Sequence, residues 1–207
     1  NTAVGYQAGD AMTTGSGHNT VVGYGAGGGL TTGPFNTAFG ALALLQETTG
    51  QYNTALGYSA GEHISGANGN TCIGFKAYEG SEGNTTGGNN VALGHEALKV
   101  TTTGSANVAV GYEALKANTT GSNIVAIGQQ ALDAHTTGSE NTAVGYHALS
   151  TMTTASCNTA IGYQAGANTT GGYNLFAGTE AGENNSTAVR CTFVGSHAGH
   201  SHTTGND

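Results

Sequence analysis

The sequence predicts an all-β protein, a parallel β-solenoid (β-roll) of about twelve 17-residue coils. Three observations lead to this fold class. A glycine recurs at a regular interval through most of the chain, as from Gly111 to Gly128 to Gly145. An apolar residue precedes it in every unit, and an alanine follows three positions later. A fixed repeat this short is typical of solenoids, in which each repeat buries its apolar face against its neighbours.

Each unit begins with a short β-strand, as in Asn141-Thr142-Ala143-Val144-Gly145. Side chains two positions apart share one face of a strand, and β-branched residues favour strands. One face therefore carries Thr or Val together with bulky aliphatic residues, and the other carries mostly Ala. The recurring glycines are Gly5, Gly23, Gly40, Gly57, Gly74, Gly94, Gly111, Gly128, Gly145, Gly162, Gly178 and Gly195.

The rest of each unit is predicted to consist of corners and turns. The invariant alanine indicates a tight interior position, and the Gly or Leu after it indicates a corner. A Thr-Thr-Gly turn follows in most units, and its glycine is expected to supply a positive φ. Segments such as Glu113 to Ala117 resemble helices. The space between the recurring glycine and the turn allows only about two helical turns, so we expect no helices.

An asparagine begins most units. Stacked side-chain amides can hydrogen-bond from coil to coil, so we interpret this column as a structural ladder rather than a ligand-binding row. The ladder comprises Asn1, Asn19, Asn36, Asn53, Asn70, Asn90, Asn107, Asn141, Asn158 and Asn174.

The stretch Asn123-Ile124-Val125-Ala126-Ile127-Gly128 resembles the head repeats of trimeric autotransporter adhesins, and similar repeats occur in phage tail fibres. Those repeats carry an Asn-Ser-Val-Ala-Ile-Gly type motif, whereas the 17-residue period and the Thr-Thr-Gly corner are departures from them. The resemblance implies a left-handed β-roll, three chains side by side and binding to a host surface.

A second resemblance is to plant ice-binding β-rolls with Asn-x-Val-x-Gly repeats. The adjacent threonines of Thr-Thr-Gly argue against ice binding, because neighbouring side chains point in different directions.

Composition restricts the class of partner. The chain has 4 Lys and Arg against 12 Asp and Glu, a net charge of −8. Binding nucleic acid needs clustered basic residues, so we expect no nucleic-acid partner. No apolar run approaches the roughly 18 residues of a membrane span. Without an initiator Met or a signal peptide, residues 1–207 are expected to form a single repeat domain taken from a longer array.

No group of residues predicts catalysis. His197-x-x-His200-x-His202 could form a weak metal site, but no acidic residue lies near it in the sequence before Asp207. We therefore expect no enzyme activity, no metal and no cofactor.

Asn-x-Ser/Thr sequons predict possible glycosylation at Asn84, Asn118, Asn168, Asn184 and Asn185. All but Asn184 precede the Thr-Thr-Gly corner or its counterpart, and His63, His135 and His202 share their column. We expect that column to be exposed. The alternative is that these asparagines only serve turn formation.

Aromatic residues often follow the recurring glycine, and the possible stripe comprises Tyr6, Tyr24, Tyr58, Tyr112, Tyr146 and Tyr163. It could stack sugars, support the rod or contact another chain. Ala41, His95, Gln129, Thr179 and Ser196 interrupt it, which favours a structural role.

The expected function is that of a non-enzymatic structural protein, the shaft or head of an extracellular fibre or filament. Self-association into a filament or trimer is expected through strand edges and the Ala-rich face. The alternatives are an adhesin or phage receptor-binding fibre recognising surface glycans and, less favoured, an ice-binding β-roll. We expect an extracellular or cell-surface location, or alternatively a virion tail fibre.

Overall fold

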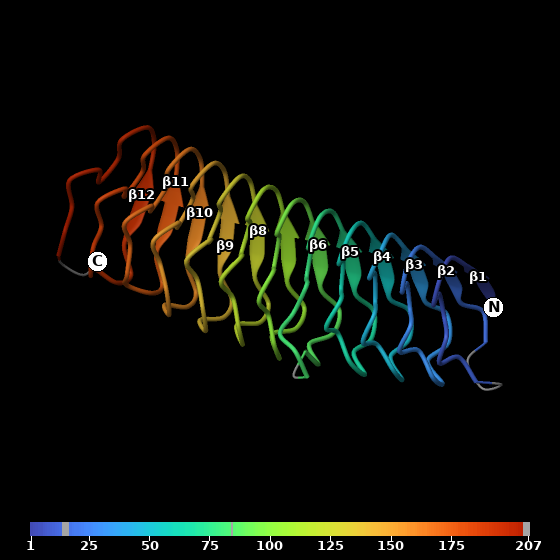
Figure 1. Ribbon diagram of the computed structural model, residues 1–207. Coiled ribbons are helices and arrows are strands. Elements are labelled where there is room, and N and C mark those ends of the chain that lie inside the picture. Colours follow the sequence, from blue (N-terminus) through green and yellow to red (C-terminus); the bar gives the residue numbers. More distant parts are fainter. Residues whose placement is uncertain (14–16, 84, 205–207) are drawn as a thin grey trace.

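The computed structural model describes residues 1–13, 17–83 and 85–204. In these ranges there is no helix, and twelve three-residue strands form one parallel sheet in sequence order. The chain is a β-solenoid with its termini at opposite ends of a rod (Figure 1). The predicted fold class is thereby confirmed. The strands are β1 (Thr2–Val4), β2 (Thr20–Val22), β3 (Thr37–Phe39), β4 (Thr54–Leu56), β5 (Thr71–Ile73), β6 (Val91–Leu93), β7 (Val108–Val110), β8 (Val125–Ile127), β9 (Thr142–Val144), β10 (Thr159–Ile161), β11 (Leu175–Ala177) and β12 (Thr192–Val194).

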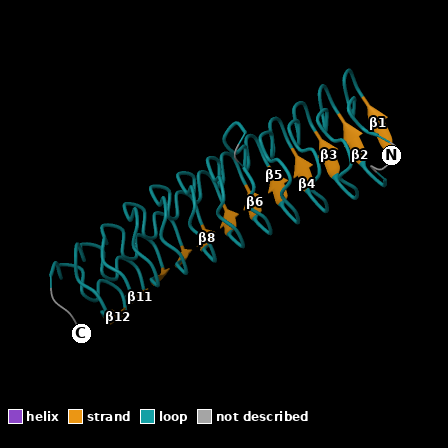
Figure 2. Cartoon of the chain, turned by 90° about the horizontal axis from the view of Figure 1, so that it is seen from below, coloured by secondary structure: helices purple, strands orange, loops and turns teal. Residues whose placement is uncertain are grey.

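The register aligns equivalent positions of successive coils. In β9 and β10, for example, Thr142 pairs with Thr159 and Ala143 with Ala160. The strands occupy one side of the rod, and turns and loops form the rest of each coil (Figure 2). A residue type that recurs every coil therefore becomes a column running along the rod.

The Ala-rich face of the strands points inward. Ala38, Ala55, Ala109 and Ala143 are fully buried at the centres of their strands. The Thr and aliphatic columns point outward instead. The expectation that copies associate through the Ala-rich face is therefore wrong, because this face is the wall of the core.

The residue after the invariant alanine also lies in the core rather than at an exposed corner. Leu44, Leu98, Leu115, Leu132 and Leu149 are fully buried. Each has a left-handed φ between 50° and 56°, and the residue two positions earlier is left-handed as well, as in Glu113. This alternation explains why the Ala- and Leu-rich segments do not form helices.

The glycine of Thr-Thr-Gly is needed for space rather than for a positive φ. Gly33, Gly87 and Gly121 are absent from the left-handed region. A Cβ at these positions would overlap the carbonyl oxygen of the equivalent glycine one coil later. The sequence-based reason for this glycine is therefore wrong, because the constraint comes from the neighbouring coil.

The asparagine column is buried except at Asn1, and it joins each coil to the next. The Asn107 Oδ1 accepts a hydrogen bond from the Ile124 N–H at 3.0 Å, and its Nδ2 donates to the Gly121 carbonyl at 2.9 Å. Most partners are thus backbone groups of the following coil rather than other amides. Each side chain satisfies one donor and one acceptor that burial would otherwise leave unpaired.

The ladder is interrupted at Ile124, and His135 takes over one of its bonds. Asparagine Nδ2 groups usually donate to the carbonyl 14 residues later, which for residue 124 would be Gly138. The His135 Nε2 lies 2.8 Å from that carbonyl oxygen. Because a carbonyl only accepts, Nε2 carries the proton. Burial of the ring lowers the pKa of His135.

We expect His135 to make the protein sensitive to mild acid. The unfolded chain binds a proton near the ordinary pKa of about 6.5, whereas the folded chain resists it. The free energy of unfolding therefore falls as pH drops below about 6.5 toward the lowered pKa, by at most about 1.4 kcal/mol per pH unit. His135→Asn removes this dependence and keeps the bond, because Asn118 donates to Gly121 in the same way at 3.1 Å.

Urea denaturation of both proteins between pH 5 and 8 measures the difference. Asp133, whose pKa burial raises, is common to both proteins, so its contribution cancels. Equal acid dependence in the two proteins would contradict the assignment.

Candidate functional site

The outward face of the sheet forms a strip along the whole rod. It consists of the first and third residues of each strand and the residue after the recurring glycine. None of these three columns contains Asp, Glu, Lys or Arg. Several large apolar side chains are about half exposed, among them Val4 (57%), Phe39 (56%) and Ile161 (48%). We call these three columns the outward strip.

The predicted aromatic stripe lies on this strip and is exposed. Its rings stack from coil to coil with centroid distances of 5.7 Å for Tyr6–Tyr24 and 5.4 Å for Tyr146–Tyr163. The sequence pattern makes His95 an interruption of the stripe. The ring instead stacks between Phe75 and Tyr112, at 4.9 and 5.2 Å. The imidazole ring is flat and about as thick as a phenyl ring, so it continues the column.

A second aromatic stack was not predicted. His18, Phe35 and Tyr52 precede the asparagine column, and their ring centroids are 5.0 and 5.3 Å apart. Their regular spacing, one ring in each of three successive coils, was the available signal. These residues have left-handed φ values between 61° and 65°, which turns the rings outward beside the sheet.

Charged side chains gather in two other columns, the second and fifth residues after the recurring glycine. In the central coils Lys76, Glu79, Glu96, Lys99 and Lys116 form a chain of ion pairs. Hydrogen bonds from Lys116 and Lys99 lower the pKa of Glu96 to about 2. The net negative charge is therefore kept away from the outward strip.

The predicted glycosylation sites differ in accessibility. Asn118 and Asn185 are fully buried, as is His135 in the same column. The expected exposure is wrong at these three positions, because their side chains fill the interior beneath the Thr-Thr-Gly corner, whereas His63 and His202 are half-buried. Asn168 is exposed and donates to the half-buried Asn184 at 3.1 Å. Asn84 lies outside the described residues. Glycosylation at Asn168 and Asn184 stays a prediction.

No protein-family model, curated protein or solved structure matches the chain. In the part of the chain that the structure describes, no helix has the length and apolar character needed to cross a bilayer. The geometry of the described residues is therefore what indicates a binding surface. A long strip without charges, in which threonines alternate with exposed aliphatic side chains beside an aromatic stack, is suited to binding a surface of similar character along its length.

Proposed function

We propose that this chain is a non-enzymatic structural rod whose copies associate side by side along the outward strip, as in the shaft or head of an extracellular fibre. The uncharged outward strip, with its exposed aliphatic and aromatic side chains, carries the proposal. Monomeric soluble proteins rarely expose large contiguous apolar patches, and such patches mark interaction surfaces. Here the surface follows the whole rod, which suits a partner of similar length.

A second copy of the chain is the occupant that fits best. Its coils repeat at the same strand spacing of about 4.8 Å, so ridges and gaps of two rods can coincide over many coils. The chain has a net charge of −8, yet its outward strip has none of the charged residues. Two copies can therefore meet there without bringing like charges together.

Lysine on the strip is expected to separate the copies. Leu93 and Ile127 are exposed on β6 and β8, and burying two ammonium groups there carries a large desolvation cost. We expect wild-type protein to sediment as an oligomer at a concentration of about 10⁻⁵ M, because interfaces of standard size commonly have dissociation constants below this concentration. The variant Leu93→Lys with Ile127→Lys should sediment as a monomer.

Thr120→Lys is the matched control, because Thr120 is exposed on the Thr-Thr-Gly corner, away from the strip. Sedimentation velocity should find it as oligomeric as wild type. A monomeric wild-type protein, or equal dissociation in Thr120→Lys, would overturn the proposal.

Glycan recognition is the second candidate, and the exposed stack Phe75–His95–Tyr112 favours it. Flat aromatic faces can lie against the apolar faces of sugars. Glycan-array binding that Tyr112→Ala removes, by protein that stays monomeric, would support an adhesin or receptor-binding fibre instead.

The structure removes the objection to ice binding that the sequence raised. The alternating Thr and aliphatic residues of the strands share the outward strip, so the objection from Thr-Thr-Gly does not apply to them. The aliphatic column nevertheless varies between Val22, Phe39, Leu56 and Ile73, which makes the surface uneven. Thermal hysteresis of monomeric protein would favour this alternative.

A further inference from the structure

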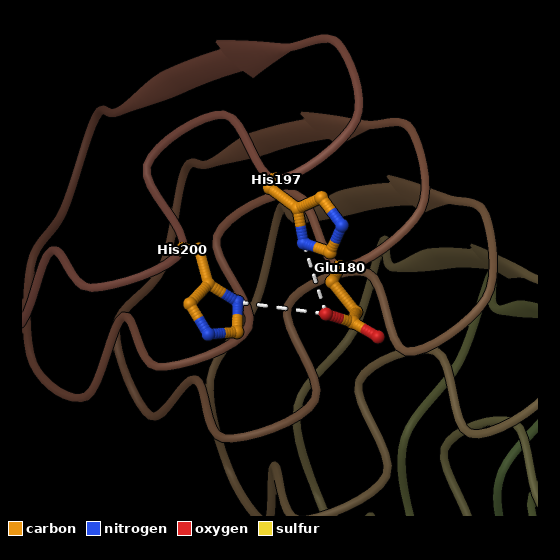
Figure 3. Close-up of side chains that lie close together, drawn as sticks. All are labelled: Glu180, His197 and His200. Atoms are coloured by element: carbon orange, nitrogen blue, oxygen red, sulfur yellow. Dashed lines mark ion pairs between the residues drawn. The ribbon is translucent and has the colours of Figure 1, made fainter.

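Two glutamates and two histidines meet on the last two coils of the rod. Glu180 and Glu183 follow β11, and His197 and His200 follow β12, each histidine at the position of a glutamate one coil earlier. The Glu180 Oε2 lies 3.0 Å from His197 Nδ1 and 3.8 Å from His200 Nδ1 (Figure 3). The Glu183 Oε2 lies 3.1 Å from His200 Nδ1. The solenoid period therefore supplies the acidic partners that the sequence around His197 lacks.

These four residues occupy the same two columns as the ion-pair chain of the central coils. There Glu79, Glu96 and Glu113 are each paired with a lysine, as in Lys116 with Glu96 at 2.8 Å and Glu113 at 2.8 Å. Glu180 and Glu183 have only histidines opposite them among the ion pairs of the described residues. A neutral imidazole offers a lone pair rather than a charge, so two carboxylates remain without a permanent cation.

The donor geometry suits a small metal ion. The ligand atoms of Glu180, His197 and His200 all lie within 4.8 Å of one another. Tetrahedral zinc, with bonds of about 2.0 to 2.2 Å, places its ligands about 3.3 Å apart. The Nδ1 of His200 is buried and makes no hydrogen bond, although it faces both carboxylates. It is thus a donor atom aimed into the cluster.

We propose that Glu180, His197 and His200 bind a divalent transition-metal ion of the zinc class, with Glu183 beside the fourth position. Imidazole together with carboxylate selects this class over calcium and magnesium, which prefer oxygen ligands alone. The ion neutralises the two carboxylates and joins the coil of β11 to the coil of β12. Metal binding to the folded chain then stabilises this end of the rod.

His202 is not part of this site. Its ring makes a T-shaped contact with Phe193 at a centroid distance of 5.3 Å, and its Nε2 lies 3.9 Å from Cys191 Sγ. The sequence motif that suggested three histidines therefore contributes two.

A second cluster, Glu62, His63 and Glu79, has ligand atoms equally close together. Lys76 donates to Glu79 at 2.7 Å, and Lys99 lies 3.9 Å from the same carboxylate. An ammonium group already balances this carboxylate and repels a second cation. We infer that this cluster stays free of metal, which makes it an internal control.

Zinc chloride titrated into metal-free protein without a histidine tag tests the proposal by calorimetry and by thermal melting. We expect one zinc ion per chain and a melting temperature that zinc raises. Glu180→Gln and His200→Gln should each weaken binding by at least about 10-fold, since even outer-shell partners of a metal carry that much. They should also abolish the zinc-dependent rise in melting temperature.

His63→Gln and His202→Gln are the matched controls and should bind zinc as wild type does. Far-UV circular dichroism and melting without zinc establish that Glu180→Gln and His200→Gln fold. The site would be overturned by fewer than one zinc ion bound per chain, or by unchanged zinc affinity in both site variants. A loss of zinc affinity in His63→Gln as large as in Glu180→Gln would overturn it as well.

Discussion

Phe176→Ala is expected to lower the free energy of unfolding by about 3 to 4 kcal/mol, the usual cost of deleting a buried phenyl ring. Phe176 is fully buried at the centre of β11 and stacks on Phe193 at 6.0 Å. Its ring fills space that Gly166 and Gly182 leave open, because a Cβ at either glycine would collide with it. Urea denaturation followed by circular dichroism measures the loss.

The complementary change should restore part of that stability. Gly182→Leu alone collides with the Phe176 ring and destabilises the protein. Combined with Phe176→Ala, it recreates the Ala-and-Leu pairing of coils such as that of Ala143 and Leu149, both fully buried. Leu149 adopts a φ of 53°, close to the 63° of Gly182, so the backbone accepts the side chain. A double variant no more stable than Phe176→Ala would contradict the pairing.

The exchange of a large for a small side chain between these two positions also shows which part of the core could not be predicted from the sequence. Period and strand positions follow from the recurring glycine alone. Which face of the strand points inward does not follow from the glycine, because Thr142 and Val144 are as compatible with a buried column as Ala143 is. The strand centre and the position after the invariant alanine face each other in the core, so in these coils a large residue at one goes with a small residue at the other. Pairing Phe176 with Gly182, and Ala143 with Leu149, was the signal that both columns share the core.

The burial of two polar side chains could not be predicted from the sequence either. Asn118 and Asn185 resemble exposed turn residues in sequence, yet the corner folds back over the core and buries them. Their accessibility depends on how far the corner turns inward, which short motifs do not encode. The partnership of Glu180 with His197 could be predicted from the period, because residues one full repeat apart stack directly. The motif His197-x-x-His200 lies within one coil, however, and the glutamates that complete the cluster belong to the coil before it.

The recurring glycine itself is expected to be the least replaceable residue of the coil, and Gly128→Ala tests this. Gly128 has a φ of 132°, and a Cβ there would lie 2.7 Å from the carbonyl carbon of Gly145. Backbone strain of about 1 to 3 kcal/mol adds to the steric overlap. We expect a total loss of roughly 3 kcal/mol or more in the free energy of unfolding, among the largest for a single methyl group.

Gly17→Ala separates this effect from glycine loss in general. An added Cβ at Gly17 meets no described atom within 4 Å, and its φ lies outside the left-handed region. Its unfolding free energy should change by no more than about 0.5 kcal/mol. If Gly128→Ala were equally mild, the coils would have to move apart at Gly145 without loss. The column of glycines would then set only the local turn, and the close approach of one coil to the next would not limit stability.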